Sequence, residues 1–358
     1  MTSVDTPGHA GPVDPDLLAM MVSLFTKFRK DTVAPNDEVT VDRELWSALT
    51  ELGLTRLTGS EEDGGSGAGW HEAASLLSAA AAAAVPAPLA ENDLLAGWLL
   101  ESAGLRSAHA IRTAGRIENG VAVVPWARCA DSVVLLRKAG DSWGIAEIPV
   151  GDAQLAAGAN LAGEPRDLVS VSESTVRWHS LPDSAGEEFL LRGALARAAQ
   201  ICGGLETIVD LCVLQATQRM QFGRALAKFQ AVQHLVADIA AETALARAAT
   251  DAAVSDVSEL GWTHDATAMS VAVAKSCASH AVSTVVRNAH QVHGAIGTTF
   301  EHDLHRYTNS ALSWRAEFGS AHTWDAVLAR SVIRTGRDDL WPLITDGRPI
   351  RDLVGELA

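Results

Sequence analysis

The stretch RMQFGRALAKFQAVQH, residues 219–234, joins two long segments of helical periodicity. Its pattern predicts that one helix ends near Arg219, that Gly223 stops it, and that the next helix begins near Phe229. Arg219 and Arg224 then lie at the turn between the helices, where a guanidinium can bind a phosphate through two parallel hydrogen bonds. A basic helix end that complements the helix dipole fits the same spacing, so the pattern alone leaves both interpretations open.

Long helical segments flank this turn. Residues 189–217 precede it, residues 230–251 and 266–292 follow it, and residues 320–333 form a shorter fourth segment. Long antiparallel helices joined by short loops are typical of a four-helix bundle. The tail after Arg334 contains Pro342 and Pro349 and shows little periodicity, which predicts a surface extension.

The first half of the chain divides into a helical and a β-rich part. Asp14 followed by Pro15 is a helix start signal, and helical patterns continue to about residue 105, broken by the Gly-rich segment at 60–69. Residues 118–182 are rich in β-branched residues and alternate like strands. The predicted fold is therefore mainly α with a small β domain. We divide it into an N-terminal helical domain (14–117), a middle β domain (118–183), a C-terminal four-helix bundle (184–335) and a C-terminal extension (336–358).

Composition excludes several classes of function. The net charge of −16 argues against a nucleic-acid partner, which would require basic patches. The four cysteines are widely spaced without a CxxC pair, and the four histidines between residues 290 and 305 have no thiolate or carboxylate arrangement to complete a metal site. No signal peptide is evident, and the apolar stretch 76–89 is too short for a membrane helix. We expect a cytoplasmic protein without a metal.

Three motifs in order carry a family resemblance. Arg-x-x-Phe-Gly followed by Phe-Gln-x-x-Gln (219–233) resembles the bundle signature of the acyl-CoA dehydrogenase family. WSALTELGL (46–54) followed by SEEDGG (60–65) is similar to the family's N-terminal helix and turn, and QVHGAIG (291–297) is similar to its Gln-x-x-Gly-Gly-x-Gly turn. The resemblance covers nearly the whole chain and agrees with the helix–β–helix order.

The resemblance implies a flavin site shared between subunits. Family members use FAD to remove two hydrogens from an acyl-CoA thioester, and their bundle motifs reach the FAD of a neighbouring subunit. By this resemblance Arg219 would contact the FAD pyrophosphate and Phe222 the flavin or adenosine. Further cofactor contacts would come from Gln291, Gly294, Ala295 and Ser320. It also implies acyl-CoA as substrate and an electron-transfer flavoprotein as a further partner.

The chain departs from the family where the catalytic base should lie. Alignment on Gly319 puts Phe318 at the usual glutamate position, with Glu317 one residue early, and one residue rotates a helical side chain by about 100°. The family's other base position falls near Gly193. The interval between Leu105 and the strand at 121–125 is also short, as if the strand and loop that hold the flavin and thioester were absent or stripped down.

Three hypotheses follow. The chain resembles the short degenerate subunits of actinobacterial heteromeric acyl-CoA dehydrogenases of the sterol side-chain type, in which a longer paralogue completes one FAD site per heterodimer. In this interpretation it serves a partner's FAD within a dimer or a dimer of dimers, in fatty acid or sterol degradation. Alternatively, it is a homomeric dehydrogenase with Glu317 as catalytic base. The third alternative is a scaffold that binds no flavin.

Overall fold

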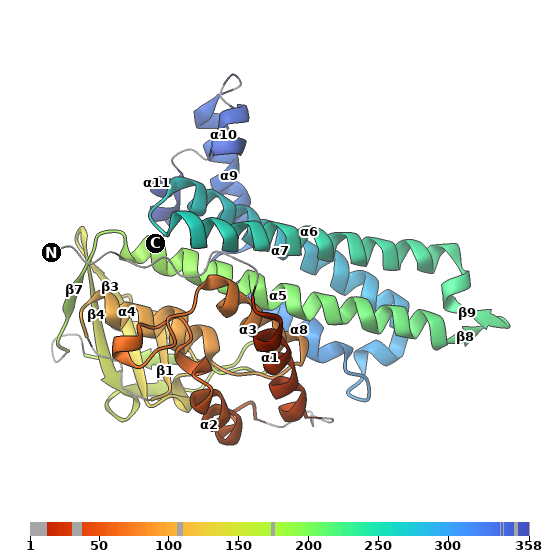
Figure 1. Cartoon of the computed structure of the whole chain (residues 1–358), viewed down its shortest axis with the longest axis horizontal. Helices are drawn as coiled ribbons and strands as arrows, with labels where there is room; N and C mark the ends of the chain where they lie inside the picture. The colour runs from red at the N-terminus through yellow and green to blue at the C-terminus, as the bar shows by residue number, and fades with distance from the viewer. Residues whose placement is uncertain are drawn as a thin grey trace.

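The three predicted parts are present in the structure, a computed structural model that describes residues 13–30, 38–105, 110–172, 176–336, 338, 340–346 and 350–357. Figure 1 shows the bundle lying along the long axis, with the β domain and the N-terminal helices packed against one half of it. The other half extends beyond them and ends in a small hairpin. The mainly α fold with a small β domain is confirmed.

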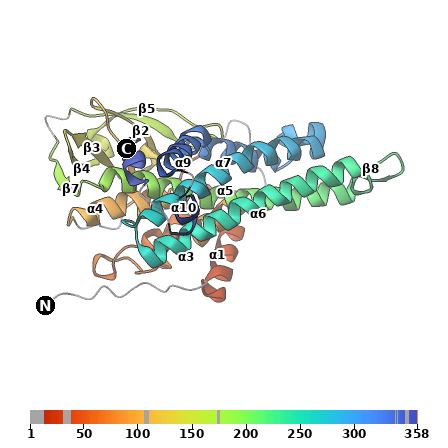
Figure 2. The same ribbon diagram turned by 90° about the horizontal axis from the view of Figure 1, so that it is seen from above.

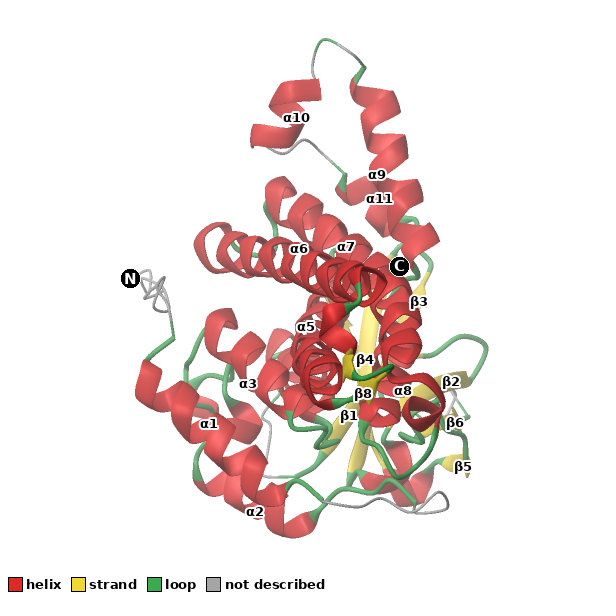
Figure 3. Cartoon of the chain, turned by 90° about the vertical axis from the view of Figure 1, so that its right-hand side faces the viewer, coloured by secondary structure: helices red, strands yellow, loops and turns green. Residues whose placement is uncertain are grey.

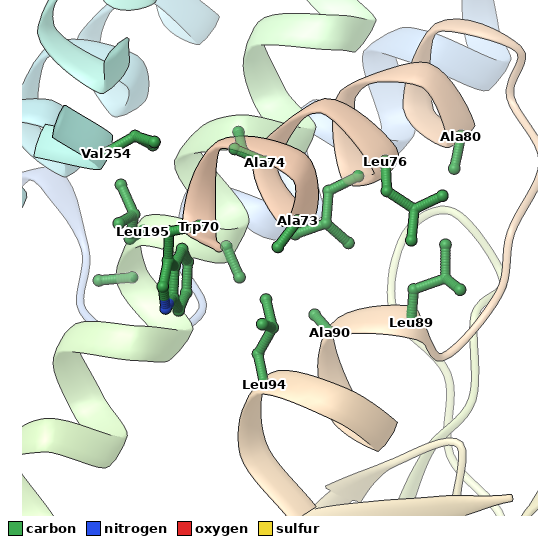
Figure 4. Close-up of a cluster of buried hydrophobic side chains, with 14 of the residues drawn as sticks. Trp70, Ala73, Ala74, Leu76, Ala80, Leu89, Ala90, Leu94, Leu195 and Val254 are labelled. Carbon is green, nitrogen blue, oxygen red and sulfur yellow. The ribbon is translucent and has the colours of Figure 1, made fainter. Parts of the chain in front are cut away.

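The N-terminal domain contains α1 (Pro15–Phe28), α2 (Arg43–Glu51), α3 (Trp70–Ala82) and α4 (Trp98–Ser102), the last preceded by a π-helical stretch at Ala90–Gly97. The start signal acts as predicted, because the Asp14 side chain accepts a hydrogen bond from the Asp16 N–H. The Gly-rich segment forms a single short turn and loop. Figure 4 shows the apolar face of α3 against the π-helical stretch and the bundle, with labelled residues Trp70, Ala73, Ala74, Leu76, Ala80, Leu89, Ala90, Leu94, Leu195 and Val254.

The β domain consists of two small sheets. One has the order β1-β3-β4-β7, formed by β1 (Arg112–Arg116), β3 (Ser132–Ala139), β4 (Ser142–Pro149) and β7 (His179–Leu181); β1 is parallel to β3 and the other pairs are antiparallel. The other is antiparallel with the order β2-β6-β5, formed by β2 (Val121–Pro125), β6 (Arg166–Ser170) and β5 (Gln154–Ala156).

Strand β1 corrects one expectation about the short interval before residue 121. A strand is present there, so the sheet starts before residue 118 and that segment is not missing as a whole. Its connection to β2 is short, with Asn119 and Gly120 both at positive φ. Burial explains the strand: Arg112 to Gly115 are all buried between neighbouring elements, although their sequence does not alternate.

The bundle contains α5 (Ala185–Gln218), α6 (Gln230–Leu260), α7 (Asp265–His293), α8 (Leu304–Trp314) and α9 (Ala321–Thr335), with the strands β8 (Met220–Gln221) and β9 (Arg224–Ala225) between α5 and α6. Figure 2, from above, shows α5, α6 and α7 running side by side. The helix α8 was not predicted. It and α9 together take the place of a single fourth helix, and residues 315–320 form the break between them.

Two bundle helices are long and apolar enough to cross a membrane by length and composition. In α5 and α7 the most apolar windows are 56% and 61% buried inside the chain. That burial is what the central helices of a folded bundle require.

The tail does not behave as the predicted surface extension. After α9 the chain forms α10 (Leu340–Asp346), which Figure 3 shows at the end of a projecting arm, and then α11 (Arg351–Gly355). Ile350, Leu353 and Val354 are 0–3% exposed and join the main core. The prediction relied on weak periodicity, and a five-residue helix is too short to show one.

Candidate functional site

The hairpin β8–β9 presents Phe222 to solvent. Phe222 is 90% exposed and has a φ of 51°, followed by Gly223 at 77°. A bulky residue at positive φ is uncommon. The contact of the Phe222 ring with Phe229 is a loose edge-to-face one, with ring centroids 6.2 Å apart. Such a projecting aromatic ring is typical of a surface that contacts another molecule.

The two predicted arginines of this hairpin have different surroundings. The guanidinium of Arg224 stacks over the Phe229 ring, 4.1 Å from its centroid. Arg219 lies at the C-terminal cap of α5, where its carbonyl accepts a hydrogen bond from the Leu226 N–H. Its side chain is exposed, and within the described residues no ion pair or hydrogen bond of its guanidinium occurs. Arg219 is therefore the freer group for a phosphate.

The second predicted motif forms an open turn at the end of α7. The helix ends at His293, and Gly294 follows with a φ of 63°. A Cβ placed on Gly294 would meet nothing within 4 Å, so a larger side chain would fit in the space around it. Glycine is favoured here because the backbone has a positive φ. Gln291, Gly294 and Ala295 are all exposed. The backbone of this turn is accessible to a ligand or another chain.

The hairpin and the turn lie at the same end of the bundle. Cys212 of α5 approaches His293 of α7, with Sγ 3.9 Å from Nδ1. Arg219 follows Cys212 by seven residues, or about 10 Å of helix. Exposed apolar side chains gather at this end: Val213, Leu214, Met220, Phe222, Ile296 and Phe300.

Both family positions for a catalytic base contain no carboxylate and lie against each other. A Cβ placed on Gly193 would lie 2.1 Å from the Phe318 ring, so that ring packs directly on the glycine backbone. Phe318 also contacts Phe189 edge to face, at 5.8 Å between centroids. The aromatic ring thus fills the space between the two positions.

Glu317 points into a network of buried charges. Its carboxylate accepts hydrogen bonds from Arg166 at 2.8 Å and from Arg197 at 2.7 Å. Burial by itself would raise the pKa of Glu317, but the charges of Arg197 and Arg166 outweigh it and hold the pKa below its ordinary value. A carboxylate paired in this way is a weak proton acceptor.

The network joins all three domains. Arg197 of α5 also pairs with Glu91 of the N-terminal domain, and Arg166 of β6 pairs with Glu164 at 3.0 Å. Arg197 and Glu91 are 2% and 1% exposed. Sequence patterns did not identify Arg166, Arg197, Glu91 or Glu164. A charged residue on the buried face of α5 was a usable signal for Arg197, since such residues are almost never buried unpaired.

Ser320 has a structural role in this structure. It caps α9, and its Oγ accepts a hydrogen bond from the Thr323 N–H at 3.2 Å. The break before it is held by Lys275, which is fully buried and donates to the carbonyls of Arg315 at 2.8 Å and Gly319 at 2.9 Å. Burial lowers the pKa of Lys275 to about 7.

Two cavities lie along the same face of α5. One, of about 320 Å³, lies between the N-terminal domain, the 161–164 loop and α8, with Arg197 and Gln200 among its lining. The other, of about 350 Å³, lies between β1, β2 and the start of α5, and Phe318 and Glu317 line its inner end. No group of three or more metal-ligating side chains occurs in the described part of the chain.

The helix–β–helix order, with a C-terminal helical bundle, is the architecture that the family resemblance implied. The acyl-CoA dehydrogenase N-terminal domain family matches residues 17–107, and the C-terminal domain family matches residues 185–333. The chain belongs to the acyl-CoA dehydrogenase family.

Named relatives support this membership. The chain is 31% identical over 309 residues to acyl-CoA dehydrogenase IpdE2 of Mycobacterium tuberculosis, and the matched region covers 84% of this chain and 87% of the relative. It is 30% identical to acyl-CoA dehydrogenase FadE34 of the same organism, but spans only 41% of that longer protein.

Solved structures show the same fold. The ChsE4-ChsE5 complex from Mycobacterium tuberculosis includes a chain that superposes with a TM-score of 0.78 at 22% identity, covering 91% of this chain and 99% of that one. The steroid ACAD Tcur3481-Tcur3483 gives a TM-score of 0.76 at 20% identity, covering 89% and 98%.

Proposed function

We propose that this chain is the non-catalytic subunit of a heteromeric, FAD-dependent acyl-CoA dehydrogenase. It would lend Arg219, Phe222 and the turn at Gln291, Gly294 and Ala295 to an FAD that a longer paralogous chain holds. When bound, FAD would supply the hydride acceptor for α,β-dehydrogenation of an acyl-CoA thioester. A steroid-type acyl group is the substrate class we favour, because one structural neighbour is named as a steroid ACAD.

The observation that carries the proposal is the contact between Phe318 and Gly193. Family members usually carry the catalytic carboxylate at one of these two positions, and this chain has an aromatic ring packed on bare backbone there. General-base catalysis needs a carboxylate within hydrogen-bond reach of the substrate proton. This chain provides none at either position, and we therefore infer that the base comes from a partner.

The homomeric alternative depends on Glu317, and its surroundings argue against it. Both of its oxygens are engaged by arginines, Oε1 by Arg166 and Oε2 by Arg197. To act as a base it would have to leave two charge-assisted hydrogen bonds and take up a proton at a lowered pKa. We therefore assign Glu317 to holding the three domains together.

The bundle end fits the cofactor-sharing role. It combines an exposed guanidinium at Arg219, an exposed ring at Phe222 and an open glycine turn at Gly294. A guanidinium can bind a phosphate, an aromatic side chain can contact a ring of the cofactor, and a glycine lets the protein backbone approach a pyrophosphate closely. A soluble monomer rarely exposes a cluster of apolar residues of this kind, so we expect a second subunit to cover it. A scaffold that binds no flavin would leave the exposed guanidinium of Arg219 and the open turn at Gly294 without a role.

The test is co-purification of flavin. The chain is expressed alone and with a longer acyl-CoA dehydrogenase chain of the same genome, and flavin absorbance per complex is measured beside the mass in solution. We expect little flavin on the chain alone and one FAD per heterodimer in the complex. Full flavin occupancy in a homo-oligomer of this chain would contradict the proposal.

A matched pair of variants locates the contact. Arg219→Ala should reduce FAD retained by the complex by about tenfold or more, since a lost charge-assisted phosphate contact contributes about 1.5–3 kcal/mol. Arg43→Ala removes another exposed arginine, at the start of α2, and should leave flavin content unchanged. Equal flavin loss in both variants would point to a general loss of stability instead.

A further inference from the structure

Four histidines gather where α7 ends and α8 begins. They are His290 and His293 in the last turn of α7, His302 before α8 and His305 in its first turn. The rings of His293 and His302 meet edge to face, with their centroids 4.6 Å apart. This contact joins the two ends of the turn at residues 294–303.

The backbone of this turn packs on the histidines at Gly297. A Cβ placed on Gly297 would lie 2.8 Å from the Cβ of His293 and 3.5 Å from Nδ1 of His290. Gly297 is buried, whereas Ile296 and Phe300 are 44% and 59% exposed. The middle of the turn therefore lies directly against the histidines, while its outer side chains face solvent.

His293 is held in its neutral form. It is 5% exposed, and its Nδ1 lies 2.8 Å from the carbonyl of Ala289, which can only accept, so the proton is on Nδ1. Nε2, the nitrogen left to take up a second proton, is buried and has no hydrogen-bond partner in the part of the chain that the structure describes. Burial lowers the pKa of His293 below its ordinary value, and the rings of His302 and His290 add to the effect. The carbonyls of Ala289 and Leu211 favour the charged ring, but they are outweighed.

His302 uses its own unprotonated nitrogen to cap a helix. Its Nδ1 accepts a hydrogen bond from the Leu304 N–H at 3.1 Å, so this nitrogen carries no proton. A second proton on the ring would break that hydrogen bond at the start of α8 and leave the N–H without its acceptor. Burial lowers the pKa of His302 as well, although the charge of Asp303 opposes the shift.

The neighbouring groups offer little compensation for a charge on either ring. Asp303 is already engaged by Arg29 of α1 at 2.5 Å and by Arg306 of α8 at 3.3 Å. The other titratable neighbours of the two rings are Cys212 of α5, His290 of α7, and Glu301 and His305 of the loop and α8. Burial raises the pKa of the Cys212 thiol to about 12, so this group stays neutral, and Glu301 is exposed to solvent.

We propose that the pair His293–His302 is a proton-sensitive clasp, which holds the turn 294–303 closed at neutral pH and releases it in weak acid. Both rings must be neutral to keep their hydrogen bonds, and two imidazolium ions in contact would repel each other. The clasp therefore stabilises the closed turn fully above the ordinary histidine pKa of about 6.5, and this contribution is lost as the pH falls below it. The inference rests on the proposed function in one respect: the turn carries Gly294 and Ala295, so its release would regulate the FAD contacts.

The experiment measures hydrogen exchange of the turn in this chain alone. Protection of the peptide covering residues 294–304, which includes the Leu304 amide bonded to His302, is compared at pH 7.5 and pH 5.5 after correction for intrinsic exchange. A peptide from the buried part of α5, residues 194–202, is the reference. We expect protection of the turn to fall at least about fivefold at pH 5.5 and the reference to stay constant. Each histidine that is neutral only in the closed form can contribute up to about tenfold one pH unit below its ordinary pKa.

A variant without titrating groups tests the mechanism. In His293→Asn/His302→Asn, the amide groups lie where Nδ1 lay, so they can donate to the Ala289 carbonyl and accept from the Leu304 N–H without taking up a proton. This variant should change its protection less than about twofold between the two pH values, and thermal unfolding at pH 7.5 checks that it is folded. If it does not fold, His302→Asn alone should lose about half of the response on a logarithmic scale.

The matched control is His280→Asn, which removes an exposed histidine of α7 that pairs with Asp325 at 2.8 Å and should keep the full response. Unchanged protection of the turn at pH 5.5, an equal loss in the reference peptide, or a full response in the asparagine variants would overturn the proposal. Because the readout is the exchange of this chain's own amides, failure of the flavin experiment would leave the clasp standing, and failure of the clasp would leave the flavin proposal standing.

Discussion

Arg197→Met should destabilise the chain because it leaves the most buried carboxylate of the central network without its partner. Arg197 is 2% exposed, and Glu91, its partner from the N-terminal domain, is 1% exposed. Burial opposes the charge of Arg197, but Glu91 and Glu317 outweigh it and raise the guanidinium pKa. Removing one member of such a buried pair costs about 3–5 kcal/mol, mostly because the remaining charge is uncompensated.

The expected shift in melting temperature follows from chain length. With an unfolding entropy of about 2.1 cal/mol/K per residue, the 358 residues give about 0.75 kcal/mol/K. The loss then corresponds to a fall of about 4–7 °C in Tm, measured by scanning calorimetry at neutral pH. Glu317→Gln should lower Tm by only about 1–3 °C, because Arg166 keeps Glu164 and Arg197 keeps Glu91.

A second substitution separates charge from packing. Adding Glu91→Gln to Arg197→Met removes the uncompensated carboxylate and should recover part of the lost Tm. If the double variant is no more stable than Arg197→Met, the loss reflects packing and the charge argument is refuted.

In the flavin-containing complex, Glu317→Gln should retain dehydrogenase activity. Complete loss of that activity would restore Glu317 as the base.

Three further sets of variants test the packing and the titration of α5. Gly203→Ala should lower the free energy of unfolding by about 1–3 kcal/mol, because the added Cβ would lie 2.2 Å from a backbone oxygen of α3. Gly204→Ala is the control: its Cβ meets open space, so it should be neutral or slightly stabilising. Thermal unfolding compares the two variants. Gly193→Ala should lower Tm, because the added Cβ clashes with the Phe318 ring, and Phe318→Ala in the same chain should relieve that clash. If the double variant loses as much Tm as the two single variants together, the contact between these residues is refuted. Burial raises the pKa of Glu187 to about 7, above its ordinary value of 4.5. The protonated side chain therefore stabilises the folded state at low pH, and this contribution is lost as pH rises through 7. Glu187→Gln should remove that part of the decline in Tm between pH 5 and 8.

The sequence located the elements whose signals are local. The start at Asp14, the stop near Arg219, the glycine that ends α7 and the long periodic segments of the bundle are set by residues within one or two turns of each other. Local patterns of this kind determine helix ends whatever the tertiary structure does. The two exposed turns at the end of the bundle were predictable for the same reason.

Short elements without a periodic pattern were missed. The strand β1 owes its existence to pairing with β3, and α11 owes its position to burial of Ile350, Leu353 and Val354 in the main core. Neither segment carries enough residues to show a pattern of its own. Their partners lie outside the segment itself, 20 residues along the chain for β1, so local propensity did not reveal either element.

The family membership and the bundle turns were therefore readable from the chain as written, whereas the state of the catalytic centre was decided by tertiary contacts. Alignment placed Phe318 and Gly193 at the two base positions, but only the folded chain shows the ring packed on the glycine. Likewise, Glu317 meets Arg166 and Arg197 across 151 and 120 residues of sequence. Contacts of that range depend on how the domains pack, and packing is a property of the whole chain rather than of any segment within it.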